Sequence, residues 1–333
     1  MKYVLAGVFI FCGIVLTSFS SLAQFIPVKN EKTNVIFDTD MGPDYDDVGA
    51  IALLHAYADS GYINILATMA STTYEGVAGV LNIFNTYYAK PDIPIGVPAK
   101  GLAYRDWQHW TDSLLHKYPH SIKLNKEAYD ATQLYRKVLA SQPDNSVTII
   151  TVGFLTNIAQ LLMSGPDEYS ALSGAALVSK KVRLMVSMAG DFPKGKQYNL
   201  QKDPASSYYV FKHWQKPVLL LGWTVGAKIK TGLQLISDNN IVNSPVKDAY
   251  AICIPMRDSD SEGRRSWDQI TVMVAVKGYS PFFTIAKGKI KVKKDGSNKW
   301  RDKKNGQQAY LIEYAPEQTI AGYIEHVMRH KRR

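Results

Sequence analysis

Cysteine is nearly absent from the sequence: the 333 residues contain only Cys12 and Cys253. Cys12 lies in an apolar amino-terminal stretch that we expect to be removed, which leaves one cysteine in the mature chain. One cysteine cannot form an internal disulfide. A disulfide-stapled fold is therefore excluded, and the folded chain must depend on its hydrophobic core.

The sequence also lacks long polar tracts, internal repeats and any linker rich in proline, glycine or serine across residues 30–320. Of its residues, 46% are hydrophobic and 20% are charged. This composition argues against a disordered chain and is sufficient for a large core. Residues 24–333 are therefore predicted to form a single domain.

No hydrophobic run reaches the roughly 20 residues that a membrane-spanning helix needs. The amino terminus has a basic residue, Lys2, then an apolar run to about Thr17, and then Ser21-Leu22-Ala23. This order is typical of a secretory signal peptide that is cleaved after Ala23. We therefore expect residues 1–23 to be a signal peptide and the mature protein to be exported, periplasmic or secreted, and not held in a membrane.

Basic residues outnumber acidic ones, 39 Lys and Arg against 29 Asp and Glu, and the formal net charge is +10. Part of this excess lies in residues 287–304, where lysines alternate with Ile290 and Val292 before Asp295-Gly296. The pattern predicts a hairpin of half-exposed strands. Its lysines could bind an anionic polymer or envelope surface. We favour protection of a solvated sheet edge, and because no aromatic residues are interleaved we expect no nucleic-acid partner.

Short apolar runs alternate with segments of helical periodicity along the chain. The runs predict strands at residues 34–38, 63–70, 93–98, 146–153, 182–190 and 217–223, and the periodic segments predict helices at 48–58, 77–88 and 155–162. This alternation predicts an α/β fold with a mostly parallel, open sheet flanked by helices. Ligands of such sheets bind at the carboxyl ends of the strands. The polar, aromatic-rich segment 101–130 is expected to be an insertion at that end.

Five carboxylates are crowded into ten positions where the first predicted strand meets the first predicted helix. They are Asp38, Asp40, Asp44, Asp46 and Asp47. Carboxylates held a few ångströms apart raise one another's pKa and repel, so the loop needs a cation or another source of relief. Because the donors are oxygen atoms with no histidine or cysteine nearby, the expected cation is Ca²⁺. Helix capping would explain one or two of these acids but not five.

The order Asp-x-Asp-x-Gly, paired aspartates and an Ala/Leu-rich helix resembles the amino-terminal motif of the nucleoside hydrolases, the inosine–uridine-preferring nucleoside N-ribohydrolase family. Four further segments resemble motifs of that family in the same order: TVGFLTNIA (151–159), VSMAG (186–190), YNLQKDPASS (198–207) and SWDQITVMVAV (266–276). The resemblance covers residues 34–320. It implies the nucleoside hydrolase fold with a Rossmann-like core and a small-molecule ribonucleoside as the substrate. Members of the family are usually oligomeric, so a homo-oligomer is expected.

Matched residue by residue, the resemblance implies a metal site and a ribose site in the same place. The implied Ca²⁺ ligands are Asp40, Asp47, the backbone carbonyl of Val152 and Asp268. Asp40 also matches the family's general base, which takes a proton from the attacking water, so it is the predicted catalytic residue. The implied contacts to the ribose and its 5′-hydroxyl are Asp46, Met188 and Asn199.

Three departures from the family pattern affect these roles. Residues 43–45 make the loop two residues longer than the commonest family form, so Asp44 is an alternative to Asp46 as the contact to metal or sugar. Residues 71–73 are Ser-Thr-Thr where the family has a ribose-contacting asparagine; a hydroxyl replaces that contact, or the contact is missing. Trp267 stands where pyrimidine-cleaving members have a histidine that protonates the leaving base.

Indole cannot act as a general acid near neutral pH, but a tryptophan beside Asp268 resembles the purine-specific branch of the family, in which aromatic side chains stack on the base. Stacking on a nucleobase contributes roughly 1–3 kcal/mol. We therefore predict that Trp267 binds the base and that purines are preferred. Trp107 and Trp110, in the segment 101–130, are further candidates for the second face of the stack.

Other residues near these motifs are given structural interpretations. His55 is expected to pack in the core. Arg264 and Arg265 are expected to lie in a solvated loop, with contact to a substrate phosphate or carboxylate as the alternative.

Together the motifs predict Ca²⁺-dependent hydrolysis of the N-glycosidic bond of a ribonucleoside, with release of ribose and, preferably, a purine. Two other hypotheses compete with this one. A nucleoside-binding protein of the same fold without turnover would explain the missing acid and the missing asparagine. A haloacid-dehalogenase-like phosphatase would share Asp38-Thr39-Asp40, but Met41-Gly42 follows here and does not fit its motif.

Overall fold

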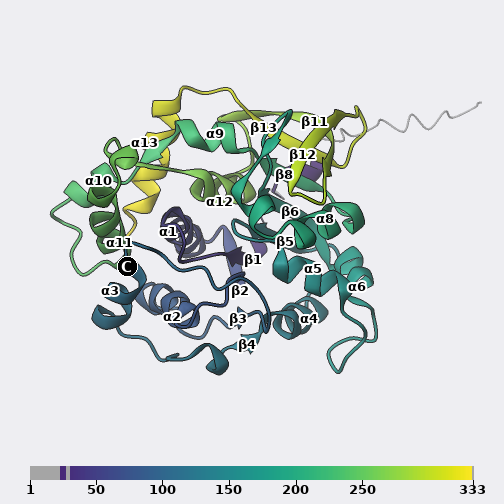
Figure 1. The fold of residues 1–333 in the computed structure, drawn as a ribbon, viewed down its shortest axis with the longest axis horizontal. Helices are drawn as coiled ribbons and strands as arrows, with labels where there is room; N and C mark the ends of the chain where they lie inside the picture. The colour runs from purple at the N-terminus through teal and green to yellow at the C-terminus, as the bar shows by residue number, and fades with distance from the viewer. Residues whose placement is uncertain (1–22, 28–30, 332–333) are drawn as a thin grey trace, which may run out of the picture.

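One large sheet passes through the centre of the computed structural model, which describes residues 23–27 and 31–331. Across the sheet its eleven strands are β4 (Tyr129–Asp130), β3 (Ile95–Val97), β2 (Ile63–Ala70), β1 (Thr33–Thr39), β5 (Val147–Thr151), β6 (Val182–Met188), β8 (Val218–Leu221), β13 (Gln308–Glu313), β11 (Phe283–Val292), β12 (Ser297–Asp302) and β7 (Lys194–Lys196). Figure 1 shows the sheet extending from β4 at the bottom of the view to β11 and β12 at the top.

Strands β4 to β13 in that spatial order all pair in parallel, whereas β11, β12 and β7 pair antiparallel with their neighbours. The prediction of an α/β fold with a mostly parallel sheet is therefore confirmed. A separate two-stranded ribbon joins β9 (Lys230–Thr231) to β10 (Arg264–Arg265).

Helices cover both faces of the sheet (Figure 1). On one face lie α1 (Asp46–Asp59), α2 (Val77–Tyr87), α3 (Trp110–Lys117), α11 (Pro245–Cys253), α12 (Trp267–Lys277) and α13 (Glu317–Met328). On the other face lie α4 (Ala131–Ser141), α5 (Thr156–Met163), α6 (Gly174–Lys181) and α8 (Pro204–His213). Short elements complete the chain: α7 (Tyr198–Lys202), α9 (Trp223–Lys228), α10 (Leu233–Ser237) and 3₁₀ turns at Ala23–Phe25, Asn125–Glu127, Ile254–Met256 and Asp258–Asp260.

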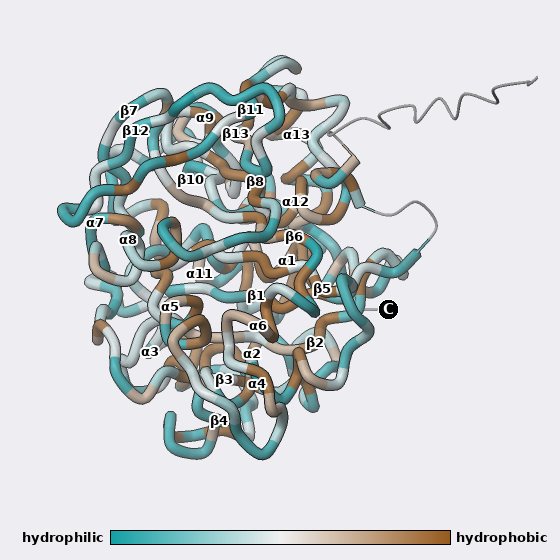
Figure 2. The backbone as a smooth tube through the Cα atoms, turned by 90° about the vertical axis from the view of Figure 1, so that its right-hand side faces the viewer, coloured by the Kyte–Doolittle hydropathy of each residue, from teal (hydrophilic) through white to brown (hydrophobic). Residues whose placement is uncertain are grey.

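Alternate residues of the central strands enter two hydrophobic cores. In β1, Val35 and Phe37 join the core beneath α1 and α12, whereas Ile36 joins the core beneath α4 and α5. Because both faces are buried, each central strand is apolar at nearly every position. Figure 2 shows the result, with hydrophobic residues concentrated in the interior and hydrophilic ones along the outer loops.

The strand order reverses at β1, which lies between β2 and β5. From β1 the chain first adds β2 and β3 on one side, and later adds β5, β6 and β8 on the other. The loops that follow β1 and β5 therefore diverge at their carboxyl ends, and such a switch point leaves a crevice that binds ligands in open α/β sheets. The acidic loop follows β1 directly.

The lysine-rich hairpin forms as predicted, with β11 antiparallel to β12 and Gly296 in the turn at φ +77°. The expectation that it forms the sheet edge is wrong, because β7 pairs with the outer side of β12. Only the short β7 is left at this edge. Lys194 and Lys196 of β7 are exposed there, so edge protection by lysine applies to β7.

The predicted strands and helices lie close to the observed ones; for example, residues 63–70 are β2 as predicted. The segment 101–130 is not without regular structure, since it contains α3 and β4. The predicted signal peptide falls on residues 1–22, outside the described residues, apart from Ala23. Among the residues that are described, no helix combines the length and the apolar character needed to cross a membrane.

Candidate active site

The acidic loop leaves β1 at Thr39 and enters α1 at Asp46. Gly42 has φ +145°, and a Cβ atom there would lie 2.4 Å from the ring of Tyr74. Only glycine combines this backbone conformation with the close contact. The tight turn brings the acids of the loop back over the ends of β1 and β5, which is where the strand order reverses.

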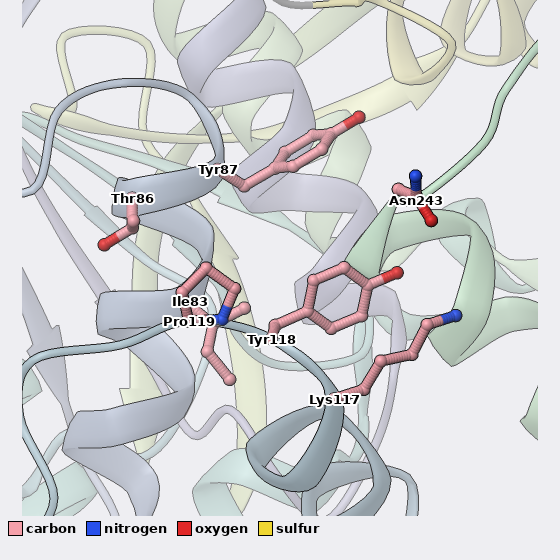
Figure 3. Close-up of a pocket in the computed structure, with 7 residues that line it drawn as sticks. All are labelled: Ile83, Thr86, Tyr87, Lys117, Tyr118, Pro119 and Asn243. Atoms are coloured by element: carbon pink, nitrogen blue, oxygen red, sulfur yellow. The ribbon is translucent and has the colours of Figure 1, made fainter.

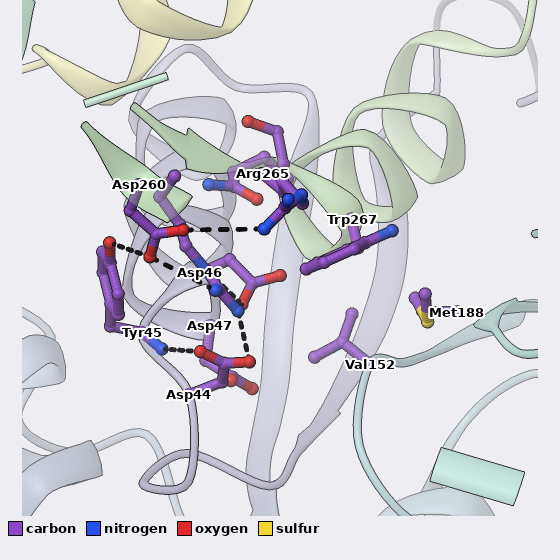
Figure 4. Close-up of polar contacts among 12 residues, drawn as sticks. Asp44, Tyr45, Asp46, Asp47, Val152, Met188, Asp260, Arg265 and Trp267 are labelled. Atoms are coloured by element: carbon purple, nitrogen blue, oxygen red, sulfur yellow. Dashed lines mark hydrogen bonds and ion pairs between the residues drawn. The ribbon is translucent and has the colours of Figure 1, made fainter. Parts of the chain in front are cut away.

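All nine residues predicted for the site line one cleft of about 180 Å³ at this switch point. They are Asp40, Asp44, Asp46, Asp47, Val152, Met188, Asn199, Trp267 and Asp268, and the lining also includes Gln197, Tyr198 and Trp223. Figure 4 shows the three aspartates Asp44, Asp46 and Asp47 to one side of Val152, with Trp267 above it in this view. The structure thus brings together residues from five separate segments of the chain.

A larger cleft of about 480 Å³ lies elsewhere, between α2, the end of α3 and Asn243 (Figure 3). Its lining residues are Ile83, Thr86, Tyr87, Lys117, Tyr118, Pro119 and Asn243, and none of these is acidic. The candidate active site is the smaller cleft, because all nine predicted site residues line it.

Three buried carboxylates form the centre of the candidate site. Oxygen atoms of Asp46, Asp47 and Asp268 lie within 4.8 Å of one another. Burial, and then repulsion by the neighbouring carboxylates, raises the pKa of both Asp47 and Asp268 well above the ordinary value. Burial also raises the pKa of Asp46 to about 6, although Arg264 opposes the shift. A cation among these oxygens would remove the repulsion.

One carboxylate oxygen of Asp47 is left unsatisfied. Its Oδ1 accepts a hydrogen bond from Thr39, but its Oδ2 is buried and has no hydrogen-bond partner among the residues that the structure describes. A buried carboxylate oxygen without a partner is costly. All the donors around it are oxygen atoms, so the residues fit a hard divalent cation.

Asp40 lies in the same cleft but outside the closest group of three carboxylates. Burial raises the pKa of Asp40 well above its usual range, and the nearby Asp44 and Asp46 raise it further. A carboxyl with a raised pKa holds a proton more readily, which suits proton transfer. The closest group contains Asp46 beside the predicted ligands Asp47 and Asp268, and the metal-ligand and general-base roles of Asp40 stay predictions.

Val152 follows β5 and lines the cleft. Its carbonyl accepts a hydrogen bond of 2.6 Å from the side-chain amide of Asn199, which also donates to the carbonyl of Met188 at 3.2 Å. A carbonyl oxygen has two lone pairs, so Val152 keeps one for a further ligand. Asn199 therefore fixes two of the predicted site groups relative to each other.

Asp38 does not line the cleft. It is fully buried and accepts hydrogen bonds from Tyr135 (2.8 Å) and Asn157 (3.1 Å), and burial raises its pKa to about 7. A phosphatase of the haloacid dehalogenase type would need the first acid of its pair as an accessible nucleophile, so this hypothesis fails on geometry. Asp38 supports the loop from below.

The prediction that Arg264 lies in a solvated loop is wrong. Its side chain is only 1% exposed, not solvated, and it forms ion pairs with Asp44, Asp46 and Asp260. Arg265 is more accessible, with 29% of its side chain exposed. This difference could not be predicted from sequence, because Asp46, a partner of Arg264 on the acidic loop, lies 218 positions away.

The aromatic wall of the cleft consists of Trp267, Trp223 and Tyr198. The indole N–H of Trp267 donates to the carbonyl of Trp223 at 2.8 Å, and the two rings lie 6.1 Å apart. The sequence analysis missed Trp223, although it begins α9 two residues after the end of β8, at the ligand-binding end of the sheet. Trp107 and Trp110 do not line the cleft: the first is 52% exposed and the second is fully buried.

The segment that replaces the family's asparagine is buried behind the cleft. The Ser71 hydroxyl accepts a hydrogen bond from the backbone N–H of Phe154, and the Thr72 hydroxyl donates to the carbonyl of Leu102. Neither residue lines the cleft. Neither Ser71 nor Thr72 therefore supplies a hydroxyl to the lining of the cleft.

Comparison with known proteins agrees with this geometry. The chain matches the family model of the inosine-uridine preferring nucleoside hydrolases over residues 35–318. The protein belongs to this family. It is therefore a hydrolase that acts on the N-glycosidic bond of ribonucleosides, as members of this metal-dependent family do, and the hypothesis of a binding protein without turnover is set aside.

Several relatives of this nucleoside hydrolase are known. The pyrimidine-specific ribonucleoside hydrolase RihA of Salmonella paratyphi A is 25% identical over 224 residues, which are 65% of this chain and 68% of that protein. The inosine-uridine preferring nucleoside hydrolase of Bacillus anthracis has a TM-score of 0.67 at 14% identity, covering 89% of this chain and 99% of that one. The purine-preferring ribonucleoside hydrolase of Gardnerella vaginalis has a TM-score of 0.67 at 16% identity, covering 89% and 98%.

Proposed function

We propose that this nucleoside hydrolase uses Ca²⁺ and prefers purine ribonucleosides, from which it releases ribose and the free base. One observation carries the proposal: a single cleft joins a group of buried carboxylates to a wall of three aromatic side chains. The carboxylates suit a cation and a ribose, and the aromatic wall suits a flat base.

The choice of Ca²⁺ rests on the donor set. The predicted ligands Asp40, Asp47, Asp268 and the Val152 carbonyl offer only oxygen, and irregular all-oxygen sites suit Ca²⁺ better than Mg²⁺. When bound, the cation supplies positive charge that offsets the buried carboxylates and makes a water easier to deprotonate.

The side chains of the cleft then divide the remaining tasks. Asp40 accepts the proton of the attacking water. Asp46 accepts hydrogen bonds from the ribose hydroxyls, and the negative charge around the ribose stabilises the oxocarbenium-like transition state. Asn199 holds the Val152 and Met188 carbonyls in place.

The preference for purines rests on Trp267, Trp223 and Tyr198. No histidine is among the residues that line the cleft in the described part of the chain, so no imidazole is placed to protonate a leaving base. Stacking helps a departing base in a different way, and it acts more strongly on the larger purine ring system. The relatives' names differ on this point, since one is pyrimidine-specific and another is purine-preferring.

The test is a chromatographic assay of base release from inosine, guanosine, adenosine and uridine, with Ca²⁺ and with a chelator. We expect faster release from the purine nucleosides and loss of activity with the chelator. Equal or faster cleavage of uridine would overturn the purine preference, and full activity in the chelator would overturn the metal requirement. Asp40→Asn is expected to lose most of the activity, and a fully active variant would refute its role as the base.

We also propose that the protein is exported and that residues 1–23 are removed, which rests on the amino-terminal sequence alone. Mass spectrometry of the mature protein should then show a chain that begins at Gln24. An intact amino terminus in the cytoplasmic fraction would contradict export. The predicted homo-oligomer stays a prediction, and light scattering in solution would measure it.

A further inference from the structure

Arg264 lies between the two halves of the substrate site, and its partners come from the part of the loop that departs from the family pattern. Asp44 forms an ion pair with it, and the Tyr45 ring lies 5.0 Å from its guanidinium carbon. Both residues belong to segment 43–45, where the loop is two residues longer than the commonest family form. The longer loop and Arg264 therefore form one structural unit.

The unit is anchored from behind by Asp260. Asp260 accepts a hydrogen bond of 2.7 Å from the Tyr45 hydroxyl and lies 3.5 Å from a terminal nitrogen of Arg264. An arginine that is only 1% exposed needs such partners, because an unpaired buried charge is strongly unfavourable. Burial lowers the pKa of Arg264, but the three carboxylates outweigh it and hold the guanidinium in its charged form.

The guanidinium of Arg264 also contacts the two residues that are proposed to bind the substrate, Asp46 and Trp267. Its Nε and a terminal nitrogen donate to the same oxygen of Asp46 at 3.3 and 2.9 Å. Its carbon lies 5.2 Å from the ring centre of Trp267, within the range of a cation–π contact. Asp46 is the proposed ribose contact and Trp267 the proposed base contact, so Arg264 joins them directly.

We propose that Arg264 is a positioning residue that couples ribose binding at Asp46 to base binding at Trp267, with Asp44 holding it in place. A ribose that fixes Asp46 would thereby also fix the surface on which the base stacks. This inference rests on the proposed function, because it takes Asp46 and Trp267 as the substrate contacts.

Lysine cannot replace arginine in this role. A planar guanidinium can donate to Asp44, Asp46 and Asp260 in different directions while its face lies over an indole ring, whereas an ammonium is a compact point charge. Arg264→Lys therefore keeps the charge but loses the coupling. Arg329→Lys is the matched control, because Arg329 also forms an ion pair with an aspartate, Asp238, but lies at the end of α13 and does not line the cleft.

The coupling can be measured with the two reaction products, which need no turnover. Calorimetry gives the affinity for hypoxanthine with and without saturating ribose, in the Ca²⁺-loaded protein. We expect ribose to tighten hypoxanthine binding by about fivefold or more in the parent protein. This gain should disappear in Arg264→Lys, shrink in Asp44→Asn and persist in Arg329→Lys.

Kinetics provide a second measurement. In Arg264→Lys, kcat/KM for inosine should fall about 10- to 100-fold, as expected when reacting groups are misplaced. The ratio of inosine to uridine cleavage should fall with it, which a general loss of folded protein would not cause. Circular dichroism establishes that each variant is folded, and Asp44→Asn, at a side chain 37% exposed, serves if Arg264→Lys does not fold.

The outcomes separate this inference from the proposed function. A parent protein that releases no base from any nucleoside contradicts the proposed function. An active parent with no ribose-dependent gain in hypoxanthine affinity contradicts the coupling alone. So does an Arg264→Lys or Asp44→Asn variant that keeps the full gain and the parent's ratio of inosine to uridine cleavage.

Discussion

Replacing Trp267 tests how the cleft recognises the base. Trp267 is the first residue of α12, directly before Asp268, and its indole N–H donates to the Trp223 carbonyl at 2.8 Å. The side chain therefore has two separable contributions: an aromatic face towards the cleft and a hydrogen bond that fixes the ring. Trp267→Ala removes both, whereas Trp267→Phe keeps an aromatic ring and removes the hydrogen bond.

The magnitudes follow from these two contributions. Stacking on a base contributes roughly 1–3 kcal/mol, which corresponds to about 5- to 150-fold in kcat/KM. The lost hydrogen bond accounts for about 1 kcal/mol, or about fivefold. Because a purine covers more of the indole than a pyrimidine does, Trp267→Ala should lower the inosine-to-uridine ratio of kcat/KM by about 10-fold. Trp267→Phe should lower this ratio by less than about threefold.

The assay is chromatographic base release under Ca²⁺ saturation, at equal concentrations of folded protein. Trp107→Ala is the control, because Trp107 is 52% exposed and does not line the cleft. It should leave the ratio unchanged. An unchanged inosine-to-uridine ratio in Trp267→Ala would refute the stacking role, and so would an equal loss in the Trp107 control.

Three further predictions concern the stability of the fold. Ca²⁺ at about 100 times its dissociation constant should stabilise the protein by about 2.7 kcal/mol. Thermal melts should show a Tm that rises with Ca²⁺ and falls again with a chelator, and Asp268→Asn should show no such rise. An unshifted Tm in the parent protein would contradict the metal site. Burial lowers the pKa of His55 to about 3, whereas an unfolded histidine titrates near 6.5, so acid protonates the unfolded chain first. The free energy of unfolding should therefore fall by about 2 kcal/mol more between pH 7.5 and pH 5 in the parent than in His55→Gln; equal slopes in urea titrations would refute this. Tyr135→Phe removes the 2.8 Å hydrogen bond to the buried Asp38 and should lower the free energy of unfolding by about 1–3 kcal/mol. The control Tyr129→Phe, at an exposed position, should leave the urea midpoint unchanged. Equal midpoints for both variants would show that the Asp38 contact does not stabilise the fold.

The core of the fold was predictable from sequence because its parallel strands are buried on both faces. Such strands are continuous apolar runs, so the limits of β2 and β6 follow closely from composition. The place of β7 was not predictable, because Lys194–Lys196 is short and polar and pairs with a strand about 100 residues later. The hairpin was therefore assigned wrongly to the sheet edge.

The candidate site was likewise predictable only in part. The acidic loop and its companions were predictable because several short motifs occur in the family's order. Arg264 and Trp223 were not, because each acquires its role through a partner that only folding brings near. From sequence alone, a charged residue in a loop is expected to be exposed to solvent. Arg264 is buried because it pairs with the acidic loop, whose Asp46 lies 218 positions away.

The central claim is that the buried carboxylates form a cation site that serves ribonucleoside hydrolysis. The most direct test is inosine hydrolysis by the parent protein and by Asp47→Asn, each with added Ca²⁺ and after chelation, with calorimetric Ca²⁺ binding measured on the same samples. The account predicts that the parent binds Ca²⁺ and releases hypoxanthine only when Ca²⁺ is present, and that Asp47→Asn loses both properties. Hydrolysis that continues at full rate after chelation, or in an Asp47→Asn protein that no longer binds Ca²⁺, would contradict it.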